Sequence, residues 1–307
     1  MSAPISAVSP QRTGARRFAV AALLYTLFVI LFGAVVRITG SGAGCGQHWP
    51  TCHGDITHLP RTVETAIELT HRVTSGLALV AVFALLALVL REKPRGHPAR
   101  RLALGAVALM IFEALIGAGL VLLALVGANG SVARALVMPA HLLSTYALTA
   151  VLALLVAWRD TPSERSRPST LLVAGGLALV VVSATGAVTA LGDTLYPPEA
   201  ASMGARLAED QASGAHFLAR LRVVHPVLAV LAAAFVGYAA LRTGGRMARP
   251  VVVLCVLQVA GGALNVFLSA PGWLQVVHLG LALSLWLAFV LLAYDDASTD
   301  HRVLFTR

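Results

Sequence analysis

Apolar residues gather into eight long stretches, and short segments that carry most of the charges separate them. The stretches cover residues 18–37, 67–90, 102–126, 136–158, 171–191, 217–241, 250–270 and 274–294. A helix of about 20 apolar residues spans the ~30 Å hydrocarbon core of a bilayer. The connecting segments are too short to form a separate soluble domain. We therefore predict an all-α, polytopic membrane protein with eight transmembrane helices.

The composition supports a membrane protein and changes how the positive charge is interpreted. Of the 307 residues, 58% are hydrophobic and only 12% are charged, whereas roughly a quarter of a soluble domain is charged. The net charge of +9 would also suit a nucleic-acid-binding protein. However, most Lys and Arg residues fall on the cytoplasmic side if the N-terminus is cytoplasmic, as the positive-inside rule requires. We predict a multi-pass cell-membrane protein with both termini in the cytoplasm and no nucleic-acid partner.

The second half of the chain repeats features of the first. Gly33-Ala-Val-Val ends the first stretch, and Gly186-Ala-Val-Thr ends the fifth. Glu113 on the third stretch has a weaker counterpart in Gln258 on the seventh. Four helices are an even number, so both copies insert in the same orientation, as in parallel-repeat membrane proteins. The repeat predicts two parallel four-helix bundles related by a pseudo-two-fold axis, formed by residues 1–160 and 161–307.

Four histidines lie near one end of alternate stretches, in a shared layer of the outer half of the membrane: His71, His141, His225 and His278. Ionisable residues inside membrane helices are rare and usually functional. Imidazole is a common ligand of haem iron, so we predict two haems, one between the first pair and one between the second. Hydrogen bonding of each ring to its neighbours is the alternative. A zinc site, which takes four clustered ligands, fits two ligands per half less well.

A carboxylate accompanies only one histidine pair. Glu68 lies three residues before His71, so the two side chains share a helix face. The equivalent position before His225 is Arg222. This difference predicts a catalytic first half, in which Glu68 carries the chemistry, and a supporting second half. The alternative is that Glu68 complements the helix dipole.

Other charged residues have two interpretations each. Arg37, Arg72 and Arg222 are candidate partners of haem propionates, since guanidinium groups favour carboxylates; anchoring at the membrane interface is the alternative. Glu113, near the middle of its stretch, is costly to bury. It either relays protons or pairs with a polar neighbour, and the sequence does not decide between them.

Two cysteines, Cys45 and Cys52, lie in the first outer loop, where disulfides are permitted. A bond between them would be either a structural staple or a redox-active pair. Metal binding together with His48, His53 or His58 is a further alternative. The third cysteine, Cys255, is most simply a packing residue.

Several of these motifs together resemble the bacterial haem A synthase family, over nearly the whole chain. They are Gly33-Ala-Val-Val-Arg37-x-Thr39-Gly-Ser-Gly42, the cysteine pair around Trp49-Pro50, Glu68-x-x-His71-Arg72, the later histidines and Gly192-Asp193-Thr194-Leu195. His48 departs from the family, which often has an acid there, and Glu113 stands where we expect Gln.

The resemblance implies that haem O is the substrate and haem A the product. The C8 methyl group of the porphyrin would be oxidised to a formyl group by successive hydroxylations. His71 and His141 would hold the substrate, with Glu68 close to its reacting edge, and His225 and His278 would hold a resident haem b. The implied partners are haem O synthase, cytochrome oxidase assembly, membrane lipid and an electron donor or acceptor that the sequence does not identify. A homo-oligomer stays open.

Two other functions compete with this interpretation. A two-haem b-type electron-transfer cytochrome would also have four histidines at equal depth. It would need neither a carboxylate beside one haem only nor an outer cysteine pair. A transporter would be expected to show broken helices at matched midplane positions, and the sequence has no convincing example.

Overall fold

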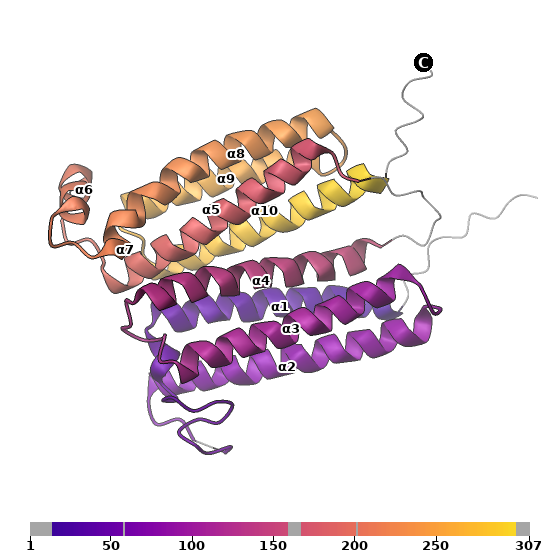
Figure 1. Cartoon of the computed structure of the whole chain (residues 1–307), viewed down its shortest axis with the longest axis horizontal. Coiled ribbons are helices and arrows are strands. Elements are labelled where there is room, and N and C mark those ends of the chain that lie inside the picture. Colours follow the sequence, from indigo (N-terminus) through magenta and orange to yellow (C-terminus); the bar gives the residue numbers. More distant parts are fainter. Residues whose placement is uncertain (1–13, 58, 159–166, 201, 299–307) are drawn as a thin grey trace, which may run out of the picture.

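The computed structural model describes residues 14–57, 59–158, 167–200 and 202–298, and this part of the chain is helical (Figure 1). Within it, eight segments are long and apolar enough to cross a membrane. They are α1 (Gly14–Ile38), α2 (Val63–Glu92), α3 (Pro98–Leu122), α4 (Val132–Ala157), α5 (Thr170–Leu195), the segment Phe217–Thr243 with α7 and α8, α9 (Ala248–Phe267) and α10 (Gly272–Ser298). The predicted all-α, multi-pass membrane protein is therefore confirmed.

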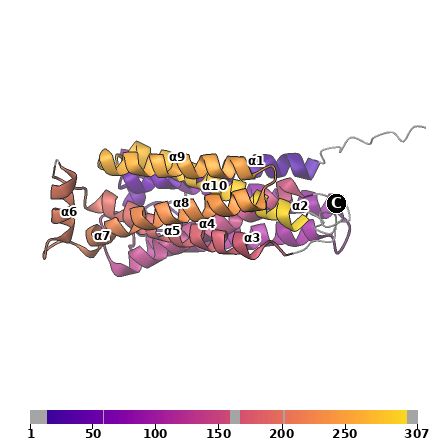
Figure 2. The same ribbon diagram turned by 90° about the horizontal axis from the view of Figure 1, so that it is seen from above.

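The helices form two groups of four. The first contains α1 to α4, and the second contains α5, α8, α9 and α10. Figure 1 shows the groups as two layers, and Figure 2 shows their helices aligned along one long axis. Each group has its own core of small and branched apolar residues, around Leu85 and Leu152 in the first and Val236 and Val251 in the second. The boundary at residue 160 and the pseudo-two-fold axis stay predictions.

The two groups meet mainly where α4 lies against α5 and α10. Tyr146 of α4 stacks on Trp286 of α10, with ring centroids 5.1 Å apart. The Trp286 indole donates a hydrogen bond of 2.8 Å to the Tyr146 carbonyl. Ser183 of α5 donates a 3.0 Å hydrogen bond to the Tyr146 hydroxyl. The indole N–H of Trp286 and the hydroxyl of Tyr146 therefore both have hydrogen-bond partners, as these groups usually do inside proteins.

The third helix is the first element that differs from the sequence prediction, because it ends earlier. We expected this helix to reach residue 126, but α3 ends at Leu122. Ala124 has a left-handed backbone with φ 52°, and the Leu125 amide bonds back to the Leu120 carbonyl at 2.8 Å. This is the geometry of a helix C-cap. The residues of the turn are apolar, so composition alone did not mark it.

The sixth predicted stretch is interrupted. It consists of α7 (Phe217–Arg220), the 3₁₀ turn η2 (Leu221–Val223) and α8 (Val224–Thr243). Pro226 explains the break, because a proline ring collides with the carbonyl four residues earlier in a continuous α-helix. That carbonyl belongs to Arg222, inside the turn.

A short helix, α6 (Met203–Gln211), was not predicted. It lies beyond the end of the second group, at the same end of the molecule as the loop after α1 (Figure 1). The Ser202 hydroxyl caps it by accepting a hydrogen bond from the Ala205 amide. The helix is too short and too polar to stand out beside the membrane-spanning stretches.

Candidate functional site

One large cavity connects the two groups of helices. Its volume is about 1000 Å³, and all four predicted histidine ligands line it. That volume is at the upper end of the range of about 300–1,000 Å³ for small-molecule and cofactor sites. The lining is mostly apolar, with a few polar side chains, as expected of such a site. The sequence therefore identified side chains that the fold brings to a common space.

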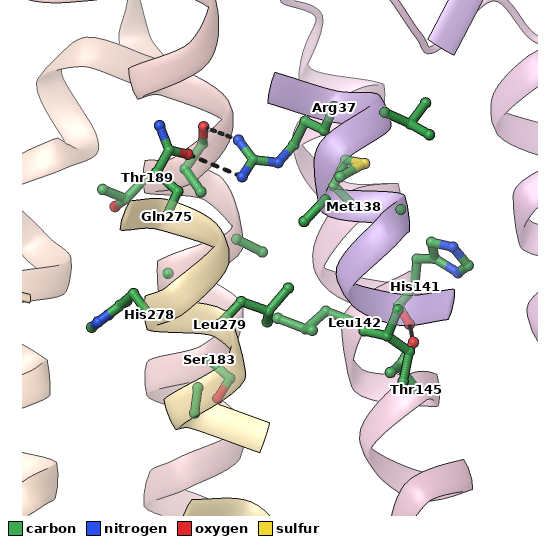
Figure 3. A pocket seen from close by; sticks show the side chains of 18 of the residues that line it. Arg37, Met138, His141, Leu142, Thr145, Ser183, Thr189, Gln275, His278 and Leu279 are labelled. Atoms are coloured by element: carbon green, nitrogen blue, oxygen red, sulfur yellow. Dashed lines mark hydrogen bonds between the residues drawn. The ribbon is translucent and has the colours of Figure 1, made fainter. Parts of the chain in front are cut away.

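Each group of helices contributes two histidines to the cavity, His71 and His141 from the first and His225 and His278 from the second. That each two bind one haem stays a prediction. Figure 3 shows His141 and His278 pointing in opposite directions, with Leu142 and Leu279 between them. These two histidines therefore lie on opposite sides of the contact between α4 and α10.

The glycine of the repeated motif, near the end of α1 and of α5, makes room for a histidine ring. A Cβ atom at Gly33 would lie 3.1 Å from His71 Cε1, and one at Gly186 would lie 2.9 Å from His225 Cε1. Both are closer than ordinary contacts, so a larger residue would push the ring away. The repeated glycine motif thus has a direct structural reason.

Hydrogen bonding at the rings tests whether they suit haem iron. Buried Nδ1 atoms of His71 and His278 have no hydrogen-bond partner within the described residues. His225 Nδ1 lies 3.2 Å from the Thr185 hydroxyl. Side-chain contacts of this kind fix the ring and leave its other nitrogen for a metal. The donor set, the apolar lining and the space beside the rings fit a bis-histidine haem site in each half. No described residues form a group of three or more His, Cys, Asp or Glu able to hold a bare metal ion.

Glu113 pairs with one of the predicted ligands. Its Oε2 atom lies 2.8 Å from His141 Nδ1, although the N–H group does not point along that line. Gln258, its counterpart in the repeat, has Nε2 3.1 Å from Nε2 of His278. The polar neighbours agree with a pairing role for Glu113, and a role in proton relay stays open.

Glu68 lines the cavity and is almost fully buried, at 3% exposure. One oxygen, Oε2, accepts a 2.7 Å hydrogen bond from the Cys45 amide. The other accepts from the Arg72 guanidinium, with Nε at 3.1 Å. Since α2 begins at Val63, Glu68 lies beyond the first turn, and the helix-dipole interpretation is weakened.

The three arginines predicted to bind propionates, Arg37, Arg72 and Arg222, each have partners among the described residues. Arg72 also donates to the carbonyls of His48 and Thr51, which fixes the outer loop on α2. Arg222 lies 2.8 Å from Asp193 and 2.7 Å from Asp210, so one cation sits between two acids. A propionate contact of either arginine stays a prediction.

Arg37 reaches from α1 into the second group. It donates to the Ala190 carbonyl at 2.6 Å, to Gln275 Oε1 at 3.0 Å and to the Thr194 hydroxyl. Figure 3 shows the guanidinium group directed across the gap between the helices. These partners could not be predicted from the sequence, because they lie more than 150 residues away along the chain.

Arg134 was missed by the sequence analysis. It is buried at 4% exposure, lines the cavity, and donates to the carbonyls of Gly127 and Asn129. An arginine two turns before His141, immediately before the apolar stretch 136–158, was a signal that could have identified it.

The predicted disulfide is present between Cys45 and Cys52. Both cysteines are buried, and the Cys45 amide holds Glu68. Cys255 is a buried free thiol in the second core, in agreement with a packing role. Of the three loop histidines considered as metal ligands, His58 lies outside the described residues. Whether the disulfide cycles stays a prediction.

These features define a class: a helical membrane protein with two histidine pairs around a shared cofactor-sized cavity. The family model described as cytochrome oxidase assembly protein matches residues 16–290. The chain therefore belongs to the cytochrome oxidase assembly protein family.

Individual relatives agree with this assignment. The chain is 46% identical over 284 residues to a Protoheme IX farnesyltransferase of Thermus thermophilus, covering 88% of this chain and 46% of that protein. It is 41% identical over 95 residues to a Heme A synthase of Alkalihalophilus pseudofirmus, covering 31% and 32% of the two chains. A Heme A synthase of Shouchella clausii is 39% identical over 108 residues, covering 35% and 36%. The chain thus spans about half the length of the Thermus relatives it matches.

Proposed function

We propose that this chain is a haem A synthase, which oxidises the C8 methyl group of haem O to a formyl group. The observation that carries the proposal is the asymmetry of the cavity. Both halves contribute two histidines, but the cavity residue three positions before the first ligand of each half is the acid Glu68 in the first half and Arg222 in the second. Relatives named Heme A synthase support it through sequence.

The two haem groups would divide between the halves. His71 and His141 hold the iron of the substrate, and His225 and His278 hold a resident haem b. The haem b supplies an iron that gains and loses single electrons, while the protein contributes ligation and orientation. Membrane topology follows the charge distribution: both termini are cytoplasmic, and the haem sites lie in the outer half of the cell membrane.

Glu68 would act on protons at the reacting methyl group. Two hydroxylations give a gem-diol, which loses water to leave the formyl group. Written with water as the source of oxygen, each hydroxylation converts –CH3 and H2O into –CH2OH, two protons and two electrons, and the electrons leave to an external electron acceptor. An ionised carboxylate has about four acceptor sites, and the bonds from Cys45 and Arg72 use three. The remaining site can receive a proton from substrate or water.

The partners follow from the chemistry of substrate and product. A farnesylated haem must come from an enzyme that attaches the farnesyl group, and the Thermus relatives carry the name of such an enzyme. We therefore infer that haem O synthase supplies this chain. The product would pass to the assembly of cytochrome oxidase, which agrees with the description of the family.

Pigment extraction from the purified protein tests the function. Haem A or hydroxylated haem O beside haem b marks the synthase. Haem b alone would instead indicate an electron-transfer cytochrome, and no pigment a transporter. The decisive variant is Glu68→Gln, which should retain haem b and haem O but make haem A at least ~10²-fold more slowly, the typical contribution of a positioned proton-transfer group.

A matched control is available on the same helix. Glu64 is an exposed acid in the first turn of α2, so Glu64→Gln should make haem A at the parent rate. Glu68→Asp should retain a little activity, since its carboxylate is one methylene shorter. Parent activity in Glu68→Gln would remove the catalytic role from this residue.

A further inference from the structure

Glu113 is held in place by one turn of the neighbouring helix. Thr145 donates a 3.1 Å hydrogen bond to its Oε2 atom, and Ser144 donates to Oε1. Both hydroxyl groups also lie close to the His141 carbonyl, at 3.1 Å for Ser144 and 2.9 Å for Thr145. Figure 3 shows Thr145 directly below His141. The carboxylate is therefore fixed to the turn of α4 that carries the ligand.

Burying this acid needs a compensating reason. The Glu113 side chain is only 12% exposed, and an acid within a membrane-spanning helix is costly unless it is paired. Two hydroxyl donors provide that pairing, and His141 Nδ1 lies 2.8 Å from the carboxylate. A metal-binding histidine commonly directs its second ring nitrogen to a carboxylate, which fixes the tautomer and raises the basicity of the ligand.

We propose that Glu113 is a positioning residue that makes His141 a stronger ligand than His278. The carboxylate lies 2.8 Å from His141 Nδ1 but is not aligned with its N–H group, so a turn of the ring that directs the Nδ1 proton to the carboxylate would present Nε2 to the substrate iron. The negative charge behind the ring favours the oxidised iron, because hydrogen bonding to a ligand tunes the iron's potential. This inference deepens the proposed function and rests on it for the identity of the substrate.

The second half lacks this device. Gln258 has the corresponding position but is a neutral amide, and it contacts Nε2 rather than Nδ1 of His278. Within the described residues, Nδ1 of neither His141 nor His278 has an aligned hydrogen bond, but His141 Nδ1 has a carboxylate 2.8 Å away. The two halves should therefore hold their irons at different potentials, with the lower potential at His141.

The test compares Glu113→Gln with the parent protein, purified and loaded with protohaem as the probe. Haem content is measured first, and a redox titration followed by visible absorbance then resolves the two sites. We expect Glu113→Gln to raise the midpoint potential of one haem and leave the other unchanged. Glu113→Asp keeps the charge but moves it away from the ring, so it should give an intermediate shift. This variant provides the test if Glu113→Gln folds poorly.

His71→Ala assigns the affected site, because the shifted wave should be the one lost in that variant. Gln258→Ala is the matched control and should leave the His141 wave in place. Equal potentials in parent and Glu113→Gln, at equal haem content, would overturn the inference. A shift in a protein that makes no haem A would reject the proposed function but keep the role of Glu113. Failure of the first half to bind protohaem would reject both.

Discussion

Glu68 and Arg222 occupy matching positions, each three residues before a histidine, but they belong to opposite networks. Glu68 is an acid supported by one arginine and one backbone amide. Arg222 is a cation held between Asp193 and Asp210. The first arrangement keeps a carboxylate at the cavity, where it can exchange protons. The second joins three helical segments, so the residue at the same position contributes to the stability of the fold.

The residue after each histidine extends this contrast. Arg72 follows His71 and joins α2 to the disulfide loop. Pro226 follows His225, where it prevents a continuous helix. In the first half one unbroken helix, α2, carries both the ligand and the acid. In the second half the matching arginine lies in the 3₁₀ turn η2 and the ligand lies in α8. A shared scaffold has thus been adapted to one reactive site and one holding site.

Removal of a second-half ligand should have the largest effect. His225→Ala or His278→Ala should lose the haem b and weaken folding, because the iron loses an anchor in an apolar cavity. Haem per protein, measured as the pyridine complex, should fall while the first half still binds haem. Unchanged haem content in both variants would contradict the assignment of these ligands.

Arg222→Met should be the most destabilising change away from the ligands. It leaves Asp193 and Asp210 without their cation in a site where all three side chains are at most 14% exposed. Breaking a buried pair costs about 3–5 kcal/mol, so the thermal midpoint should drop markedly. Glu68→Gln, in contrast, should mainly lose activity.

The control for this prediction is Arg246→Met. Arg246 lies 3.5 Å from Asp295, and its side chain is 72% exposed. An exposed pair contributes about 0–1 kcal/mol. Equal losses of stability in the two arginine variants would show that Arg222 has no special structural role.

The disulfide should stabilise the first half by a smaller amount. Closing a loop with a sequence separation of 7 gives about 2.5 kcal/mol by the chain-entropy estimate. A membrane-impermeant thiol reagent should add two labels from the outer side only after reduction. Labelling without a reductant would show free thiols, and full activity of the double Ser variant with added reductant would leave the pair an accessory.

Alanine at the two repeat glycines should have the smallest effect and still separate the halves. Gly186→Ala brings a methyl group to 2.9 Å from the His225 ring, whereas Gly33→Ala brings one to 3.1 Å from His71. We expect a loss of about 1 kcal/mol from overpacking, larger at Gly186. The position of the Soret band and the haem affinity of each half measure it. If Gly186→Ala and Gly33→Ala give equal Soret spectra, the His225 and His71 rings move freely away from the added methyl groups.

Local patterns were sufficient to predict much of this molecule. The length of each apolar stretch predicted the helices, and the register of the histidines predicted which side chains share the cavity. The partners of Arg37 and the Cys45 amide that binds Glu68 could not be predicted, since they are backbone and side-chain groups on other segments. The end of α3 at Leu122 was missed because Ala124 adopts a turn conformation without the usual glycine.

The break beside Pro226 has a consequence for protein engineering. Grafting the acid of the first half into the second by Arg222→Glu would place a third carboxylate beside Asp193 and Asp210. The 3₁₀ turn at Leu221–Val223 would also aim it differently from Glu68, which sits on an unbroken helix. Pro226 and both aspartates would have to change with it. Converting the holding site into a second reactive site therefore requires a redesign of the segment rather than one substitution.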